Sequence, residues 1–173
     1  MTRTMRIGKA GKIAAALCAV MLLGACAKKT GDGLDGANGG YGANGGRGGP
    51  PGSTQDFVVN VGDRVFFETD STELTSTARS ILDKQASWLS RYPRYAITVE
   101  GHADERGTRE YNFALGARRS QVTRDYLAAR GVGGGRIKTI SYGKERPVAV
   151  CDDISCWSQN RRAVTVLGGA AGY

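Results

Sequence analysis

Histidine and cysteine are scarce in this chain of 173 residues, which contains one histidine and four cysteines. The histidine, His102, lies far along the chain from Cys151 and Cys156, and these three groups are too few ligands for a metal site. No serine or cysteine lies in an evident nucleophile setting beside His102, although a hydrolytic enzyme needs a nucleophile and a base that activates it. We therefore expect no metal, no cofactor and no enzymatic activity, and we interpret His102 as a residue that shapes its loop.

The chain also lacks an N-terminal apolar run long enough to cross a membrane, because the run over residues 13–23 has only eleven residues. This run follows a basic segment and ends in small residues, which is typical of a secretory signal peptide over residues 1–25, with a buried N-terminal helix as the alternative. The segment Leu23-Gly24-Ala25-Cys26 resembles the bacterial lipobox, which implies that Cys26 carries an S-linked diacylglycerol and an N-linked palmitoyl chain. Two or more acyl chains anchor a protein stably in a membrane. An aspartate directly after the lipidated cysteine resembles the signal that retains lipoproteins in the inner membrane. This chain has Ala27 at that position, which favours the outer membrane.

Acidic residues are fewer than basic ones, with 16 Asp and Glu against 24 Lys and Arg and a formal charge of +8. A basic balance of this kind can indicate a nucleic-acid partner. Four of the basic residues lie within residues 1–12, where no acidic residue occurs, so half of the excess belongs to the predicted signal peptide. We therefore expect no nucleic-acid binding.

Apolar periodicity is absent from the segment that follows the signal peptide. From Gly31 to Gly52, eleven of 22 residues are glycine. Such a segment buries too little surface to fold by itself, so residues 26–53 are predicted to form a flexible tether behind the lipidated cysteine. No Gly-Lys-Ser/Thr ending follows the glycines, which excludes a phosphate-binding loop.

Residues 54–170 are predicted to form one domain, because this length suits one core and is too short for two. Alternating and helical patterns predict, in order, a strand at 64–67, a helix at 75–90, a strand at 96–99, a helix from 108 to 131, a strand at 137–142 and a strand at 161–167. This order indicates an α/β (α+β) sandwich with a mixed sheet and helices packed on one face.

Residues 99–119 read as a strand, a polar loop and a helix, and they contain the candidate binding site. Thr108 is expected to cap the helix, on which Asn112, Leu115 and Arg119 are spaced to form one stripe. The stripe begins beside the loop that carries Asp104, so a carboxylate and a guanidinium can face one small space with an amide between them. Such a site suits a zwitterion, with Asp104 on its ammonium group and Arg119 on its carboxylate.

The same stretch carries a family resemblance. Residues 101–108 read Gly-His-Ala-Asp-Glu-Arg-Gly-Thr and residues 111–119 read Tyr-Asn-Phe-Ala-Leu-Gly-Ala-Arg-Arg, which resembles the OmpA-like peptidoglycan-binding domain in the form found in peptidoglycan-associated lipoproteins. The resemblance covers roughly residues 56–167 and implies a βαβαβ-β fold. It also implies that Asp104 and Arg119 bind the meso-diaminopimelate of peptidoglycan stem peptides. The further residues assigned to the peptidoglycan site are Asp70, His102, Ala103, Asn112 and Leu115. For Asp70, a capping role within its own loop is an equal alternative.

The resemblance also implies protein partners. Glu105, Arg106 and Arg109 form a rim beside the site and are candidates for contact with TolB, the β-propeller protein of the Tol system, with TolA as a further candidate. The implied function is to link the outer membrane to the cell wall, supporting envelope integrity and outer-membrane constriction during cell division. The alternatives are an amidase-like enzyme acting on the wall and a wall anchor for another envelope complex.

Cys151 and Cys156 lie five residues apart in a predicted loop between the last two strands. In an oxidising periplasm they are expected to form a disulfide that closes this loop, with two reduced thiols as the alternative.

Overall fold

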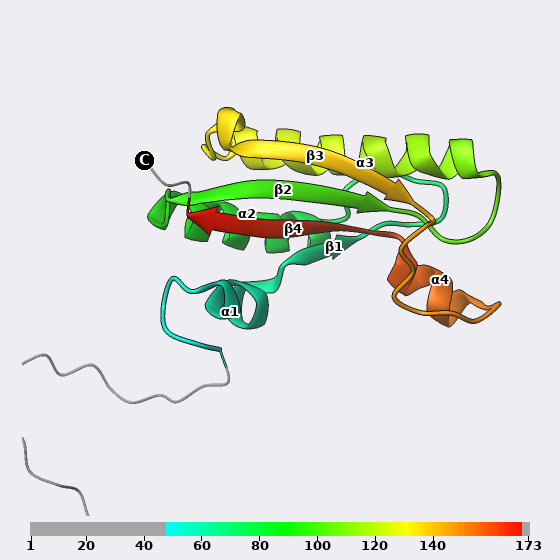
Figure 1. Cartoon of the computed structure of the whole chain (residues 1–173), viewed down its shortest axis with the longest axis horizontal. Helices are drawn as coiled ribbons and strands as arrows, with labels where there is room; N and C mark the ends of the chain where they lie inside the picture. The colour runs from blue at the N-terminus through cyan, green and yellow to red at the C-terminus, as the bar shows by residue number, and fades with distance from the viewer. Residues whose placement is uncertain (1–47, 171–173) are drawn as a thin grey trace, which may run out of the picture. The chain divides into compact units, whose positions relative to one another are not determined.

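The computed structural model describes the backbone of residues 48–170 (Figure 1). The predicted signal peptide, the predicted lipidation site Cys26 and most of the predicted tether lie outside the described residues. Contacts between Cα atoms divide the chain into Met1–Gly42 and Ala43–Tyr173, and the hydrophobic core belongs to the second unit. Within the described residues, no helix has the length and apolar character needed to cross a membrane.

Ten short and long elements follow one another along the described chain. They are α1 (Thr54–Asp56), η1 (Phe57–Gly62), β1 (Arg64–Phe66), α2 (Ser76–Arg91), β2 (Tyr95–His102), α3 (Arg109–Ala129), η2 (Gly134–Arg136), β3 (Ile137–Gly143), α4 (Ile154–Asn160) and β4 (Arg162–Ala170). Each strand and long helix predicted from the sequence occurs, with ends that differ by a few residues.

The sheet has four strands in the order β1-β4-β2-β3. β2 and β3 run parallel, whereas β4 lies antiparallel to both β1 and β2. Figure 1 shows α2 and α3 together behind this sheet. The structure therefore confirms the predicted mixed sheet with helices on one face.

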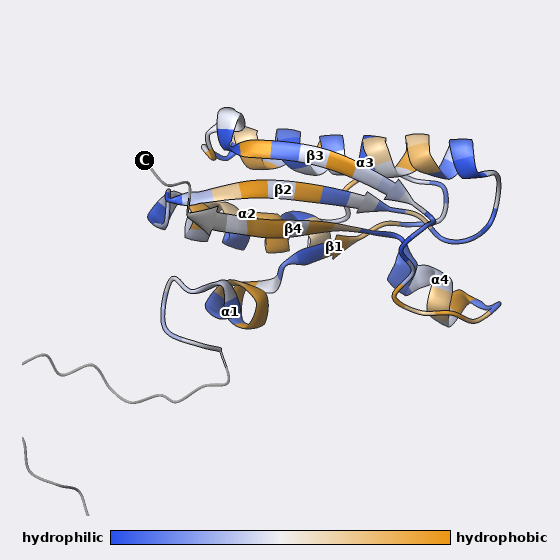
Figure 2. Ribbon diagram, viewed as in Figure 1, coloured by the Kyte–Doolittle hydropathy of each residue, from blue (hydrophilic) through white to orange (hydrophobic). Residues whose placement is uncertain are grey.

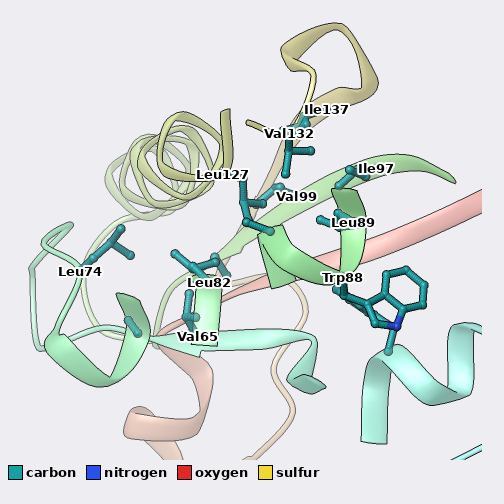
Figure 3. Close-up of a cluster of buried hydrophobic side chains, with 14 of the residues drawn as sticks. Val65, Leu74, Leu82, Trp88, Leu89, Ile97, Val99, Leu127, Val132 and Ile137 are labelled. Atoms are coloured by element: carbon teal, nitrogen blue, oxygen red, sulfur yellow. The ribbon is translucent and has the colours of Figure 1, made fainter. Parts of the chain in front are cut away.

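The core fills the space between the sheet and these two helices (Figure 3). Ile97 and Val99 of β2 meet Leu82 and Leu89 of α2 and Leu127 of α3, and all five side chains are buried. Apolar and polar residues alternate in the middle of β2 in Figure 2, because one face of the strand meets the core and the other does not.

One buried polar side chain in this core has its hydrogen-bonding groups paired. Gln85 Nε2 donates to the carbonyl of Gly62 at 2.7 Å, and Gln85 Oε1 accepts from Thr165 Oγ1 at 2.8 Å. A buried amide without such partners would be costly. The two bonds thus link α2 to the end of η1 and to β4.

Two segments contain helices that the sequence patterns do not predict. Residues 57–62, which precede β1 and are rich in valine, form helical turns that bury Phe57 against Trp88 of α2, with ring centroids 4.9 Å apart. The predicted loop between the last two strands contains α4, which begins after Asp153; its Oδ1 accepts from Ser155 N at 2.7 Å. The packed region also begins before residue 54, because the carbonyl of Gly52 accepts from Tyr95 Oη at 2.7 Å.

Candidate functional site

The candidate site is built where β2 ends and α3 begins. Thr108 caps α3 as predicted, because its Oγ1 accepts from the backbone N–H of Tyr111 at 3.2 Å. Asn112 Nδ2 donates to the carbonyls of Arg106 at 2.7 Å and Thr108 at 3.1 Å. The amide of Asn112 therefore fixes the loop from the first turn of the helix, so the loop conformation depends on the helix beneath it.

Five of the predicted site residues line one pocket of about 220 Å³. They are Asp70, Asp104, Asn112, Leu115 and Arg119. The helical stripe predicted from spacing thus faces the loop of Asp104 and the loop before α2 at the same time. Their ligand-binding roles stay predictions.

Arg119 lies beneath this pocket and is fully buried. Its Nε donates to the carbonyl of Ser71 at 2.9 Å, its Nη1 to that of His102 at 2.9 Å and its Nη2 to that of Glu68 at 3.1 Å. Burial lowers the pKa of Arg119 to about 10, which still leaves the guanidinium charged at pH 7. Among the described residues it forms no ion pair, and two of its five N–H groups have no bond to these carbonyls.

Asp104 is almost completely buried and already has two cationic neighbours. Its Oδ2 accepts from Arg106 Nη2 at 2.7 Å and from Arg161 Nη1 at 3.4 Å. Burial alone would raise the pKa of Asp104, but the hydrogen bonds from Arg106 outweigh it and hold the pKa below its usual range. Asp104 is therefore an anion at neutral pH, and in this structure its partners are these two arginines rather than Arg119.

Asp70 and Tyr111 join the two sides of the pocket, because Tyr111 Oη donates a hydrogen bond to Asp70 Oδ1. Asp70 has φ +55°, a left-handed conformation that is uncommon for residues other than glycine. The bond to Asp70 raises the pKa of Tyr111. Tyr111 was missed in the sequence, although Tyr111, Leu115 and Arg119 follow one another at intervals of four and so lie along one side of α3.

His102 and Ala103 do not line this pocket. His102 contributes its carbonyl to Arg119, while its ring lies 5.6 Å from the ring of Tyr142 on the sheet face away from α3. The backbone N–H of Ala103 donates to the carbonyl of Gly143 at 2.8 Å. Both residues therefore shape the site through their backbone, in agreement with the interpretation of His102 as a residue that shapes its loop. The ring of His102 lies apart from the pocket of the candidate ligand.

The predicted rim residues are exposed, and each has a partner of its own. Glu105 Oε1 accepts from the indole N–H of Trp157 at 2.8 Å, and Arg109 Nε donates to Glu145 Oε1 at 3.1 Å. The guanidinium of Arg106 lies 4.2 Å from the centre of the Trp157 ring. Arg106 thus belongs to the pocket as well as to the rim, and Trp157 and Arg161 were missed because they come from the distant C-terminal part of the chain.

The structure contains the disulfide between Cys151 and Cys156, with Cα atoms 5.6 Å apart, which confirms the predicted pair. It joins the end of the loop before α4 to α4 itself, the helix that carries Trp157. In the part of the chain that the structure describes, no group of three His, Cys, Asp or Glu residues could hold a metal ion.

Comparisons with known proteins place this geometry in a family. The model of the OmpA family matches residues 66–161. The peptidoglycan-associated lipoprotein of Rhizobium meliloti is 64% identical over 155 residues, which are 90% of this chain and 86% of that protein. The protein of the same name from Agrobacterium fabrum is 77% identical over 120 residues, which cover 69% of this chain and 68% of that protein.

Solved structures with a similar fold include a protein of the same name. The peptidoglycan-associated lipoprotein of Burkholderia pseudomallei superposes with a TM-score of 0.60 at 40% identity, over 61% of this chain and 90% of that one. The C-terminal domain of Helicobacter pylori MotB, at 23% identity, shares the fold with a TM-score of 0.59, over 63% of this chain and 86% of that one. The chain therefore belongs to the peptidoglycan-associated lipoproteins, a family of non-enzymatic proteins whose folded domain is of the OmpA type.

Proposed function

We propose that this chain is a lipid-anchored outer-membrane protein that binds peptidoglycan non-covalently, through the meso-diaminopimelate of a stem peptide. The observation that carries the proposal is Arg119, a buried guanidinium whose only polar partners among the described residues are three backbone carbonyls. Buried charges in proteins are usually paired with an opposite charge. A ligand carboxylate that reaches the two remaining N–H groups would supply that charge.

The second charge of the ligand is matched on the same pocket. The side chain of meso-diaminopimelate ends in a carbon that carries both an ammonium group and a carboxylate. Asp104 and Arg119 line one pocket, and both are charged at neutral pH. Leu115 lines it too and offers an apolar wall for the methylene groups of the ligand. Asp70 is a further candidate contact at the mouth of the pocket.

The wider role that we propose is a link between the outer membrane and the cell wall within the Tol–Pal system. Lipid on Cys26 and the tether over residues 26–53 would hold the domain near the membrane, facing the periplasm. Glu105, Arg106 and Arg109 are exposed beside the pocket and are the candidate contacts for TolB, with TolA as a further partner. Such a link would support envelope integrity and outer-membrane constriction during division.

The test uses residues 43–173, which form a compact unit with their own core. This fragment is sedimented with purified sacculi that contain meso-diaminopimelate, in the presence of a soluble tripeptide that ends either in meso-diaminopimelate or in lysine. Lysine keeps the ammonium group but lacks the carboxylate for Arg119. We expect only the meso-diaminopimelate tripeptide to release the protein. Equal release by both, or by neither, would overturn the assignment.

A matched pair of variants tests Asp104 in the same assay. Asp104→Asn keeps the shape of the side chain but removes the charge, and losing a buried charged contact should weaken binding about tenfold or more. Asp83→Asn is the control, because Asp83 is an exposed aspartate of α2 that pairs with Arg130. Equal affinities for the two variants would exclude Asp104 from the site.

A further inference from the structure

The carboxylate of Asp104 is fully occupied in this structure. Its Oδ1 accepts from Arg106 N at 3.2 Å and from Arg106 Nε at 3.4 Å. Its Oδ2 accepts from Arg106 Nη2 at 2.7 Å and from Arg161 Nη1 at 3.4 Å. A carboxylate offers about four positions for hydrogen-bond donors. A ligand ammonium group can therefore reach Asp104 only after one of these donors leaves.

The two arginines differ in how firmly they are held. Arg161 is buried, and its Nε also donates to the carbonyl of Phe67 at 3.0 Å. The side chain of Arg106 is 41% exposed, and within residues 48–170 the partners of its guanidinium are Asp104 and the ring face of Trp157. Arg161 is thus a fixed part of the site, whereas Arg106 is the donor that a ligand can displace.

Trp157 holds Arg106 in place from outside the pocket. Its ring lies 4.2 Å from the guanidinium, and its N–H donates to Glu105, the residue between Asp104 and Arg106. Trp157 follows Cys156 on α4, and the disulfide to Cys151 ties that helix to the loop before it. Stacking of a guanidinium on an indole ring is favourable, so the ring steadies the ion pair between Arg106 and Asp104.

We infer that Arg106 is a specificity-determining residue that occupies the cation position at Asp104 until the ammonium group of the ligand displaces it. The inference rests on the proposed function and adds a free-energy cost to ligand binding. A ligand with an ammonium group must break the pair between Arg106 and Asp104. A ligand without one leaves the pair intact and keeps only its contacts with the rest of the pocket. Arg106 therefore reduces the affinity advantage of a ligand with an ammonium group over a ligand without one.

Removing the guanidinium should raise the affinity for one probe and not for another. The first probe is the tripeptide ending in meso-diaminopimelate, and the second is the same tripeptide with the side-chain amine acetylated. In Arg106→Gln, the first probe no longer has to displace an arginine. Because the ion pair that it would otherwise break is partly exposed, its affinity should rise by about fivefold. The acetylated probe carries no ammonium group that could replace the missing guanidinium at Asp104. It should therefore bind Arg106→Gln no better than it binds the wild type.

Calorimetric titration of residues 43–173 measures both affinities. Arg118→Gln is the matched control, because Arg118 is an exposed arginine on the same helix as Arg119 and loses the same charge. Trp157→Leu should also raise the affinity for the first probe, but by less than Arg106→Gln, and it should add nothing in the double variant. Thermal unfolding of each variant verifies that it is folded.

The outcomes separate this inference from the proposed function. If the wild-type protein binds the first probe and Arg106→Gln binds it equally or more weakly, the role of Arg106 is overturned while the proposed function stands. If neither protein binds the first probe, the proposed function fails and the inference fails with it. A gain of the same size in Arg118→Gln would show a general effect of charge and would also overturn the inference.

Discussion

Arg119 Nη1 donates to the backbone carbonyl of His102 at 2.9 Å, and this bond joins the middle of α3 to the end of β2. The same guanidinium donates to the carbonyls of Glu68 and Ser71 in the loop before α2. One side chain thus holds together three segments around the pocket. The charge that we assign to ligand binding also supports the geometry of the site.

We expect Arg119→Lys to lower both the stability of the domain and its affinity for sacculi. Lysine keeps the charge, but its compact ammonium group cannot reproduce the planar fork that reaches three carbonyls. A buried polar group without a partner costs about 1–3 kcal/mol, so the free energy of unfolding should fall by about 3 kcal/mol. Urea denaturation of residues 43–173 measures this loss.

Arg118→Lys is the control for this prediction, because Arg118 is exposed one position earlier on α3. Its stability should stay within about 0.5 kcal/mol of the wild type. If Arg119→Lys is as stable as this control, the three hydrogen bonds contribute little, and Arg119 serves the ligand alone.

The parts of the site that could be predicted depend on neighbours close in sequence. Thr108 caps α3 as expected, with its Oγ1 accepting from a backbone N–H at 3.2 Å, and Thr75 caps α2 in the same way at 3.1 Å. Helical spacing likewise placed Asn112, Leu115 and Arg119 on one buried side of α3. A helix fixes the relative directions of residues three or four apart, so these relations can be derived from the sequence alone.

The parts that were missed depend on contacts between distant segments. Arg161 reaches Asp104 across 57 residues, and nothing in local spacing indicates that pair. The valines of residues 57–62 favour a strand by their branched side chains, yet this segment is helical and buries Phe57 against α2. Tertiary packing therefore overrides local preference there. The stretch predicted as a loop between the last two strands contains α4, which begins after Asp153.

We expect Gly101→Ala to destabilise the domain strongly, because β2 and α3 are closest at this glycine. A Cβ atom at Gly101 would lie 1.8 Å from the carbonyl oxygen of Gly116, which is part of the helix backbone. The helix would have to move away from the sheet, at a cost of about 3 kcal/mol or more. Urea denaturation measures this cost.

Gly135→Ala provides the matched comparison for this prediction. No atom lies within 4 Å of a Cβ built at Gly135, and its φ is not in the left-handed region. Its stability should therefore equal that of the wild type. Equal stability of Gly101→Ala and Gly135→Ala would mean that the helix can shift at little cost.

Reduction of the disulfide should lower the stability of the domain. Cys151 and Cys156 close a loop with a sequence separation of five, for which the loss of chain entropy in the unfolded state corresponds to about 2 kcal/mol. Thermal unfolding with and without a reducing agent measures the effect in the wild type. The double variant Cys151→Ala/Cys156→Ala should unfold at the temperature of the reduced wild type and should not respond to the reducing agent. A wild type that is equally insensitive, with two titratable thiols, would contradict the disulfide.

His102 is buried on the face of the sheet opposite to α3, and its two ring nitrogens have no hydrogen-bond partner within residues 48–170. Its Nε2 lies 3.6 Å from Glu100 Oε2. The charged groups that lower its pKa by repulsion are Arg64, Arg146 and Arg162. Burial, the larger cause, together with these arginines lowers the pKa of His102 to about 4.

This lowered pKa predicts that the domain loses stability in mild acid. The unfolded chain takes up a proton at His102 as the pH falls through about 6.5, whereas the folded chain does so only near pH 4. The unfolded state therefore binds more protons between these two values, and the free energy of unfolding decreases by as much as about 3 kcal/mol across the interval. Urea denaturation at pH 7, 5.5 and 4.5 measures the decrease.

His102→Phe isolates this contribution. Phenylalanine keeps an aromatic ring beside Tyr142 and loses no hydrogen bond of the imidazole, because none is present among the described residues. The variant should fold, and its stability should change little between pH 6.5 and 4.5. Below pH 4 both proteins should weaken together, because the pKa values of Asp56 and Asp104 are lowered in the folded state and those carboxylates then take up protons mainly on unfolding. An unchanged slope in His102→Phe would assign the loss in mild acid to other groups.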